Sequence, residues 1–227
     1  MSIHLYSRIS GAGEPLILLH GNGEDSTYFK NQIRYFSKSY QVIAVDTRGH
    51  GKSPRGKAPF CIRQFAQDLR DFMDEKGIQK AHILGFSDGG NIALIFAVKY
   101  PDRVERLIVN GANLNAKGVK PAVQIPIEIG YRIASLFAKR SREARRNAEL
   151  LGLMVNDPNI PVSELKKITA KTLVIAGTKD MIREEHTRLI CESLPHGELV
   201  LIPGDHFIAE KNPQGFNRAV EKFLCEP

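Results

Sequence analysis

Ser87 stands in the pentapeptide Gly85-Phe86-Ser87-Asp88-Gly89, which has the pattern G-x-S-x-G. An apolar run over residues 81–84 precedes it and a helical stretch from Asn91 to Lys99 follows, which predicts a sharp turn between a strand and a helix. Glycines at both ends of the pentapeptide carry no Cβ, so the turn can hold the serine in a strained conformation. A serine exposed in this way can attack a carbonyl carbon. The pattern also arises by chance in glycine-rich chains, so its partners decide its meaning.

A serine hydroxyl is a poor nucleophile at neutral pH unless a base removes its proton, and an acid must hold that base in the right tautomer. In folds with this type of turn, the acid and then the histidine follow the serine, each just beyond its own strand. Asp180 follows an apolar run that ends at Gly177, and His206 follows one that ends at Ile202. We therefore predict Ser87, His206 and Asp180 as nucleophile, base and acid.

Other residues compete for these roles. The remaining histidines lack a matching strand-end position downstream of the serine, and a lone histidine is usually structural. Asp205 is next to His206, but neighbours on an extended chain point apart. The preceding strand is followed by Asn110-Gly111-Ala112-Asn113, which has no carboxylate, so Asp180 remains the predicted acid. The alternative for Asp180 is a loop aspartate in a turn.

The negative charge that forms during acyl transfer needs two preorganised N–H donors. The first is predicted to be the backbone N–H of Asp88, directly after the nucleophile. The second is predicted in His20-Gly21-Asn22-Gly23, where glycines allow the backbone to turn its N–H groups inward, and we assign it to Asn22. A plain strand-to-helix turn is the alternative explanation of this loop.

Short apolar runs alternate with helical patterns along the chain, which predicts an α/β fold with a mostly parallel, doubly wound sheet covered by helices. Continuous apolar runs are typical of strands buried on both faces. The strands are predicted at Leu16 to His20, Val42 to Asp46, Ala81 to Phe86, Val104 to Asn110, Thr172 to Gly177 and Glu198 to Ile202. Helical spacing appears around Phe65 to Met73, Ile92 to Lys99 and Phe216 to Phe223. Gly11-Ala12-Gly13 is interpreted as a hairpin turn.

The alternation stops at Gly111 and resumes near Lys171, which predicts an insertion of two or three helices at about residues 113–168, a small lid. Ser141 is a candidate cap of its second helix, and the segment from Asp157 to Pro161 breaks the chain. Four apolar residues keep a helical period in its first helix: Ile129, Ile133, Leu136 and Phe137. They could line an acyl pocket or pack onto the main sheet, and we expect packing.

The chain has 227 residues, of which 42% are hydrophobic and 25% are charged, which predicts one domain over residues 1–227. No apolar stretch is long enough to cross a membrane and no signal sequence is apparent, so we expect a cytoplasmic protein without a membrane partner. Its three scattered cysteines agree with a reducing compartment. The net charge is +7, and residues 113–168 contribute ten Lys or Arg against five Asp or Glu. Because no aromatic residues interleave with the densest cluster, from Lys139 to Arg146, we expect a solvated helix face and no nucleic-acid partner.

The chain resembles the α/β-hydrolase superfamily over nearly its full length. The resemblance rests on the G-x-S-x-G turn and on Asp46-Thr47-Arg48-Gly49-His50-Gly51-Lys52-Ser53, which is similar to a family loop at the edge of the sheet. It implies the α/β-hydrolase fold and supports Ser87, Asp180 and His206 as the triad. The run Ser87-Asp88-Gly89-Gly90 is similar to valacyclovir-hydrolase-type members, in which the aspartate is implicated in holding a substrate amino group. Lys171-Thr172 departs from the family, which often has a proline before that strand.

Asp88 is unexpected beside an oxyanion, because at ~5–6 Å and an effective dielectric of ~20 the repulsion is about 3 kcal/mol. A substrate cation, an internal Lys or Arg, or hydrogen bonds from amides would have to compensate it. Our hypothesis is that Asp88 selects esters that bear an amino group.

The sequence therefore predicts a serine hydrolase of small carboxylic esters that works through an acyl-enzyme. The rate should rise with pH as His206 loses its proton. No metal or organic cofactor is expected, since no ligand spacing and no dinucleotide fingerprint is present. Hydrolases of carbon–carbon bonds and cofactor-free perhydrolases share this triad and remain alternatives. A ligand-binding protein without catalysis, on the same scaffold, is the alternative from another class.

Overall fold

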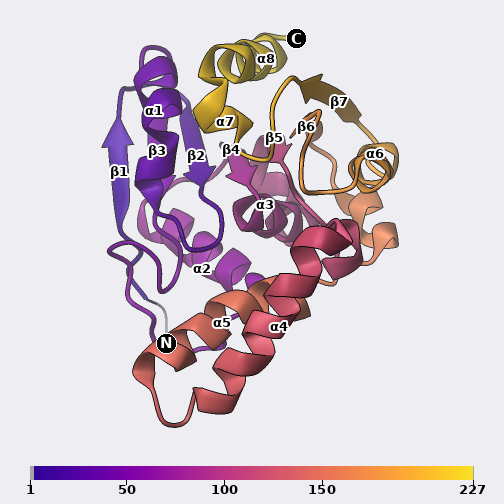
Figure 1. Cartoon of the computed structure of the whole chain (residues 1–227). Helices are drawn as coiled ribbons and strands as arrows, with labels where there is room; N and C mark the ends of the chain where they lie inside the picture. Colours follow the sequence, from indigo (N-terminus) through magenta and orange to yellow (C-terminus); the bar gives the residue numbers. More distant parts are fainter. Residues whose placement is uncertain (1–2, 227) are drawn as a thin grey trace.

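The computed structural model describes residues 3–226 of the chain. Seven strands in this range form one sheet in the order β1-β3-β2-β4-β5-β6-β7 (Figure 1). The strands are β1 (Ser7–Ser10), β2 (Pro15–Leu19), β3 (Gln41–Val45), β4 (Ala81–Phe86), β5 (Val104–Asn110), β6 (Lys171–Gly177) and β7 (Gly197–Ile202). The helices are α1 (Lys30–Phe36), α2 (Ile62–Glu75), α3 (Asp88–Lys99), α4 (Pro121–Phe137), α5 (Arg142–Asn156), α6 (Glu184–Glu192), α7 (Ile208–Lys211) and α8 (Pro213–Cys225). The predicted α/β-hydrolase fold is confirmed.

All six predicted strands are present, and each begins and ends within one residue of its predicted bounds. Five of them were recognisable because most side chains on both of their faces are buried, whereas the edge strand β7 is mostly half-buried. Alternate residues of β2, for example, enter two separate apolar clusters: Ile17 packs with α2 and α3, and Leu18 packs with α1 and α8. The sheet is therefore the middle of three layers.

The interpretation of Gly11-Ala12-Gly13 as a hairpin turn is wrong. The short strand β1 was not predicted, and it pairs antiparallel with β3, which lies between β1 and β2. The glycines carry the chain from β1 past the end of β3 into β2. A Cβ on Gly11 would lie 2.3 Å from the Ser37 oxygen, so the turn needs glycine where it crosses this segment.

The loop after β3 is anchored by a buried ion pair. Arg48 and Asp68 are almost fully buried, and both oxygens of Asp68 accept hydrogen bonds from the guanidinium at 2.6 Å. Asp46 accepts hydrogen bonds from the backbone N–H groups of Ser26 and Lys52. These contacts tie the loop to α2 and to the segment after β2, so the edge of the sheet near Ser87 is well ordered by polar contacts.

The segment between β5 and β6 contains the helices α4 and α5 and two short 3₁₀ helices, Ala116–Gly118 and Val162–Lys167. Ser141 caps α5, because its side chain accepts a hydrogen bond from the Ala144 N–H, and α5 ends at Asn156 before Asp157 and Pro158. Figure 1 shows α4 and α5 side by side. No helix formed by residues 3–226 is long and apolar enough to cross a membrane.

The expected packing of α4 onto the main sheet is wrong. Ile129, Ile133, Leu136 and Phe137 are between 51% and 77% exposed. The helix lies on α5, and these side chains are mostly exposed, with Ile133 and Phe137 at the edge of a hollow between α4 and α5. Periodicity alone shows that a helix has an apolar face and does not show what covers it.

Candidate active site

Ser87 occupies the sharp turn between β4 and α3, with φ 53° and ψ −119°. A positive φ is rare for a residue with a side chain and costs about 1–3 kcal/mol. The Ser87 N–H donates to the Asn110 oxygen at 2.8 Å, which fixes the turn against β5. A Cβ on Gly85 would lie 2.2 Å from the Gly89 oxygen, and one on Gly89 would lie 2.0 Å from the Leu19 oxygen. Both glycines are thus required by close backbone contacts, as expected from the sequence.

A chain of two hydrogen bonds joins Ser87 to His206 and Asp180. The Ser87 Oγ lies 3.0 Å from His206 Nε2, and His206 Nδ1 lies 2.7 Å from Asp180 Oδ1. Because the carboxylate needs an N–H at Nδ1, the neutral ring accepts the serine proton at Nε2. Three residues that are up to 119 positions apart therefore meet at the carboxyl ends of β4, β6 and β7. His206 and Asp180 are buried.

The competing aspartate lies outside this chain of hydrogen bonds. Asp205 is partly exposed, accepts the Phe207 N–H and pairs with Lys211. The Asp180 carboxylate also accepts the Ile182 N–H at 2.9 Å, which fixes its orientation toward the imidazole. Adjacent residues do point apart here, as argued from the sequence.

The two predicted oxyanion donors belong to different loops, Asp88 to the serine turn and Asn22 to the loop after β2. Asp88 is the first residue of α3, where backbone N–H groups have no partner within the helix. In the other loop, the Gly21 N–H donates to Glu24 Oε2 at 3.1 Å and His20 Nδ1 donates to the Gly21 oxygen at 2.7 Å. The side chain of Asn22 donates to the Leu150 oxygen of α5 at 2.7 Å. The backbone of Asn22 is thus held between the sheet and α5.

Aromatic rings pack against the imidazole on one side. Phe86, the residue before the serine, lies with its ring centroid 4.8 Å from that of His206 and stacks on Tyr28 at 4.4 Å. Glu24 lies in the loop after β2, as Asn22 does, and burial raises the pKa of its carboxyl group to about 7. No role in the site was predicted for Phe86, Tyr28 or Glu24 from the sequence. Only the charge of Glu24 within a glycine-rich loop could have pointed to it.

Asp88 is buried and has no basic partner among residues 3–226. Its Oδ1 accepts a hydrogen bond from Asn91 Nδ2 at 3.3 Å, whereas its Oδ2 has no hydrogen-bond partner in the described residues. Asn91 also donates to Asn113, at the start of the segment that contains α4 and α5. Burial, and then the charge of Asp157, raise the pKa of Asp88 to about 7. An internal Lys or Arg, one of the three compensations considered for this carboxylate, is therefore not found.

Gly111 is a further residue of the site that sequence reasoning missed. It follows β5 with φ +62°, and a Cβ there would lie 2.6 Å from His206 Cε1 and 2.8 Å from its Nδ1. The imidazole of His206 thus packs directly against the backbone of Gly111. The dipeptide Asn110-Gly111 at a strand end indicates a turn in the sequence, but it does not indicate that His206 packs against that turn.

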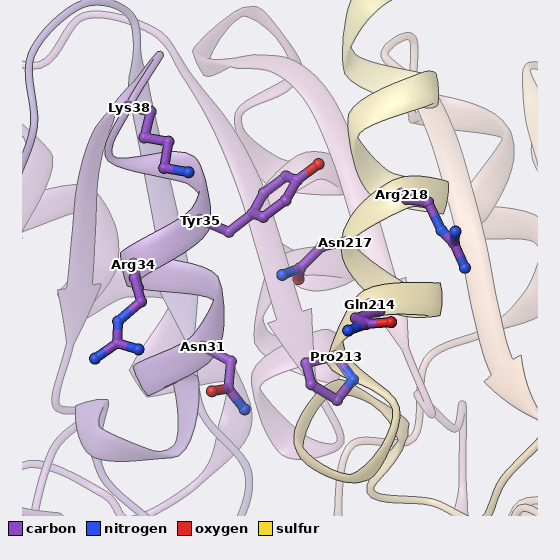
Figure 2. Close-up of a pocket in the computed structure, with 8 residues that line it drawn as sticks. All are labelled: Asn31, Arg34, Tyr35, Lys38, Pro213, Gln214, Asn217 and Arg218. Atoms are coloured by element: carbon purple, nitrogen blue, oxygen red, sulfur yellow. The ribbon is translucent and has the colours of Figure 1, made fainter.

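A separate groove of about 430 Å³ lies between α1 and α8 and contains none of these residues (Figure 2). Arg34 and Arg218 stand on opposite walls, and their guanidinium groups do not converge. The groove therefore does not contribute to the site at Ser87.

Comparison with known proteins agrees with this description. The model of the alpha/beta hydrolase fold family matches residues 14–155, more than half of the chain. The chain belongs to this family. It is 28% identical to 3-oxoadipate enol-lactonase 2 of Acinetobacter baylyi over 96% of this chain and 92% of that protein. It is 29% identical to a 2-hydroxy-6-oxo-6-phenylhexa-2,4-dienoate hydrolase of Burkholderia cepacia over 98% and 91%.

The crystal structure of the enol-lactonase from Burkholderia xenovorans LB400 has a TM-score of 0.83, with 23% identity, and covers 99% of this chain and 97% of that one. This likeness concerns the fold. Uncharacterised mycobacterial proteins are 34% identical over 138 residues, and the chain spans only 38% of their length.

The contact between Gly111 and His206 predicts the effect of a single methyl group. We expect Gly111→Ala to displace the imidazole and to slow modification of Ser87 by a fluorophosphonate at least about 100-fold. Gly77→Ala is the matched control, because Gly77 has φ +66° and nothing lies within 4 Å of its Cβ position. It should lose a similar amount of stability, about 1–2 kcal/mol, and keep its labelling rate. Equal labelling of both variants would contradict the positioning role.

The pKa of Asp88 predicts a stability that depends on pH. Because its folded-state pKa is raised from 3.8 to about 7, the folded protein binds the proton more tightly, and stability falls as pH rises through this window. Asp88→Asn removes the buried charge, so urea unfolding should show the variant gaining up to about 4 kcal/mol over the wild type between pH 4 and about pH 8.

Asp205→Asn provides a control of opposite sign. The Lys211 contact lowers the pKa of Asp205, so this variant should lose stability relative to the wild type as pH rises. If the difference in unfolding free energy between Asp88→Asn and the wild type did not change with pH, the description of Asp88 as a buried carboxylate without a compensating cation would be wrong.

Proposed function

We propose that the protein is a serine hydrolase that cleaves small carboxylic esters through an acyl-enzyme. The observation that carries the proposal is the hydrogen-bonded chain from Ser87 through His206 to Asp180 on a strained turn. Membership of the alpha/beta hydrolase fold family supports hydrolysis as the reaction class. The similarity to an enol-lactonase, whose name describes cleavage of a cyclic ester, supports an ester as substrate.

In the proposed mechanism, Ser87 Oγ forms a bond to the carbonyl carbon while its proton passes to His206 Nε2. The negative oxygen is held by the N–H groups of Asn22 and Asp88. The tetrahedral intermediate then breaks its bond to the alcohol, which takes the proton from His206. A water molecule attacks the acyl carbon with His206 again as base, and Ser87 leaves with the proton. Asp180 stays ionised and orients the ring throughout.

The buried carboxylate of Asp88 supports a narrower proposal, that the preferred esters carry a protonated amino group. Its unpartnered Oδ2 would accept a hydrogen bond from an ammonium group, and the pair would favour the charged carboxylate. This agrees with the resemblance of Ser87-Asp88-Gly89-Gly90 to valacyclovir-hydrolase-type members. An ammonium group bound to Asp88 would also lie near the developing oxyanion. It would offset the repulsion between that oxyanion and the Asp88 carboxylate.

A carbon–carbon bond hydrolase is the second candidate. It is supported by the 29% identity to the Burkholderia cepacia hydrolase over most of both chains. Both reactions need the same three side chains, so the choice depends on substrates. A cofactor-free perhydrolase, which needs the same triad, and a binding protein without catalysis are the remaining candidates. The substrate as a free small molecule and the cytoplasmic location stay predictions.

Labelling separates an enzyme from a binding protein. The wild type should react covalently with a fluorophosphonate and hydrolyse p-nitrophenyl butyrate, and Ser87→Ala should lower kcat at least about 10⁴-fold and abolish labelling. Ser163→Ala removes an exposed serine outside the site and should behave as the wild type. Undiminished labelling of folded Ser87→Ala would refute the assignment.

The role of Asp88 is tested by comparing a valine ester with its analogue that lacks the amino group. Asp88→Asn should lower kcat/KM for the amino ester about 10-fold to 100-fold, the value of a charged hydrogen bond, and leave the analogue nearly unchanged. Equal losses on both esters would exclude pairing with the substrate amine.

A further inference from the structure

The outer face of α4 exposes a stripe of large apolar side chains. The members of this apolar stripe are Ile125, Ile129, Ile133, Leu136 and Phe137, and each is more than half exposed. Their spacing of three or four residues, closed by an adjacent pair, places them on one side of a single helix. Isolated exposed apolar residues are ordinary, but a continuous stripe of this length marks an interaction surface.

The rest of α4 contains few charged side chains. Its 17 residues contain only two charged side chains, Glu128 and Arg132. The opposite side of the helix packs on α5, where Gln124 and Ala134 are buried. A hollow of about 690 Å³ between α4 and α5, lined in part by Ile133 and Phe137, extends the apolar surface toward α5. No part of residues 3–226 covers this surface.

Directly beyond the stripe, the chain turns into α5 through a cluster of cations. The cationic turn consists of Lys139, Arg140, Arg142, Arg145 and Arg146, and all five side chains are exposed. Among residues 3–226, none of them forms an ion pair with a carboxylate, and Glu143 is the one acidic residue within the turn. Three of these cations lie in the first turns of α5, where the helix dipole is also positive. Three of them also line a pocket with Arg55 and Glu149, where Glu149 pairs with Arg55, so the turn keeps a net positive charge.

Two kinds of occupant could bury such a face: a second copy of the chain or a surface of opposite charge. If two α4 helices packed in parallel, each cationic turn would face the other. If they packed antiparallel, each turn would approach Lys117, Lys120 and the positive end of the partner's α4. Both orientations are opposed by like charges. A surface with anionic groups above an apolar interior could pair with the cationic turn and bury the apolar stripe at the same time.

We propose that the apolar stripe of α4 and the cationic turn bind the surface of a membrane that contains anionic lipids. α4 would lie in the plane of the interface, with Leu136 and Phe137 among the acyl chains and the cations at the level of the lipid phosphates. With 17 residues the helix is too short to span a bilayer. The sequence led us to expect no membrane partner because that argument concerned spanning segments only. This inference does not depend on the proposed hydrolase activity.

Vesicle flotation of the full chain tests the proposal. The protein should bind phosphatidylcholine vesicles in which about one lipid in three is phosphatidylglycerol, bind pure phosphatidylcholine much more weakly, and dissociate as salt is raised. The double variant Arg142→Gln with Arg145→Gln should lower the partition coefficient about 30-fold, as expected for two surface charges. Leu136→Ser with Phe137→Ser should lower it at least about tenfold.

Matched controls distinguish this surface from general attraction by the net charge. Lys166→Gln with Lys167→Gln removes two exposed cations elsewhere, and Ile9→Ser removes an apolar side chain that is 54% exposed. Both controls should bind as the wild type does. Losses in the controls as large as in the test variants, or no binding to anionic vesicles, would overturn the proposal. A dimer in light scattering that Leu136→Ser with Phe137→Ser dissociates, without vesicle binding, would assign the face to a second copy instead.

Discussion

The close approach of α3 to the sheet is the constraint on which the candidate site depends. The backbone of Gly89 touches that of Leu19, and the backbone of Gly85 touches that of Gly89, at separations that no Cβ could tolerate. The chain can make this turn only if Ser87 takes a positive φ. The strain persists because β4 and most of α3 are buried, so relaxing the serine would displace elements that hold the core together.

The parts of the fold that the sequence predicted are those determined by burial on both faces. Most of the six predicted strands were recognisable as continuous apolar runs, and the order of the serine, acid and histidine followed from three strand ends. β1 was missed because it has only four residues, none of them is buried, and only Ile9 has a large apolar side chain. The hairpin was wrongly expected because sequence shows that a chain turns but not which strand lies beside it. α4 was placed against the sheet because its period reveals an apolar face without revealing a partner.

The same limit applies to the site. Gly111 and Phe86 matter through contacts with His206 that only the folded chain creates. Asp88 could be recognised as anomalous from its position beside the nucleophile, and the sequence left three ways to compensate it. The structure removes the internal cation from these. A buried carboxylate without a basic partner among residues 3–226 lowers stability above neutral pH, so the described fold does not account for its presence beside Ser87.

The two helices of the α4–α5 pair are attached to the domain in different ways, and the attachments meet the site. α5 is held through the Asn22 side chain on the Leu150 oxygen and through the ion pair between Arg55 and Glu149. α4 is held at its start, where Lys120 donates to the Asp180 oxygen. These contacts involve the residues proposed to hold the oxyanion and to orient the imidazole. A displacement of α4 caused by binding at its outer face would therefore be transmitted to Asn22 through α5 and to Asp180 through Lys120. Neither route involves the sheet.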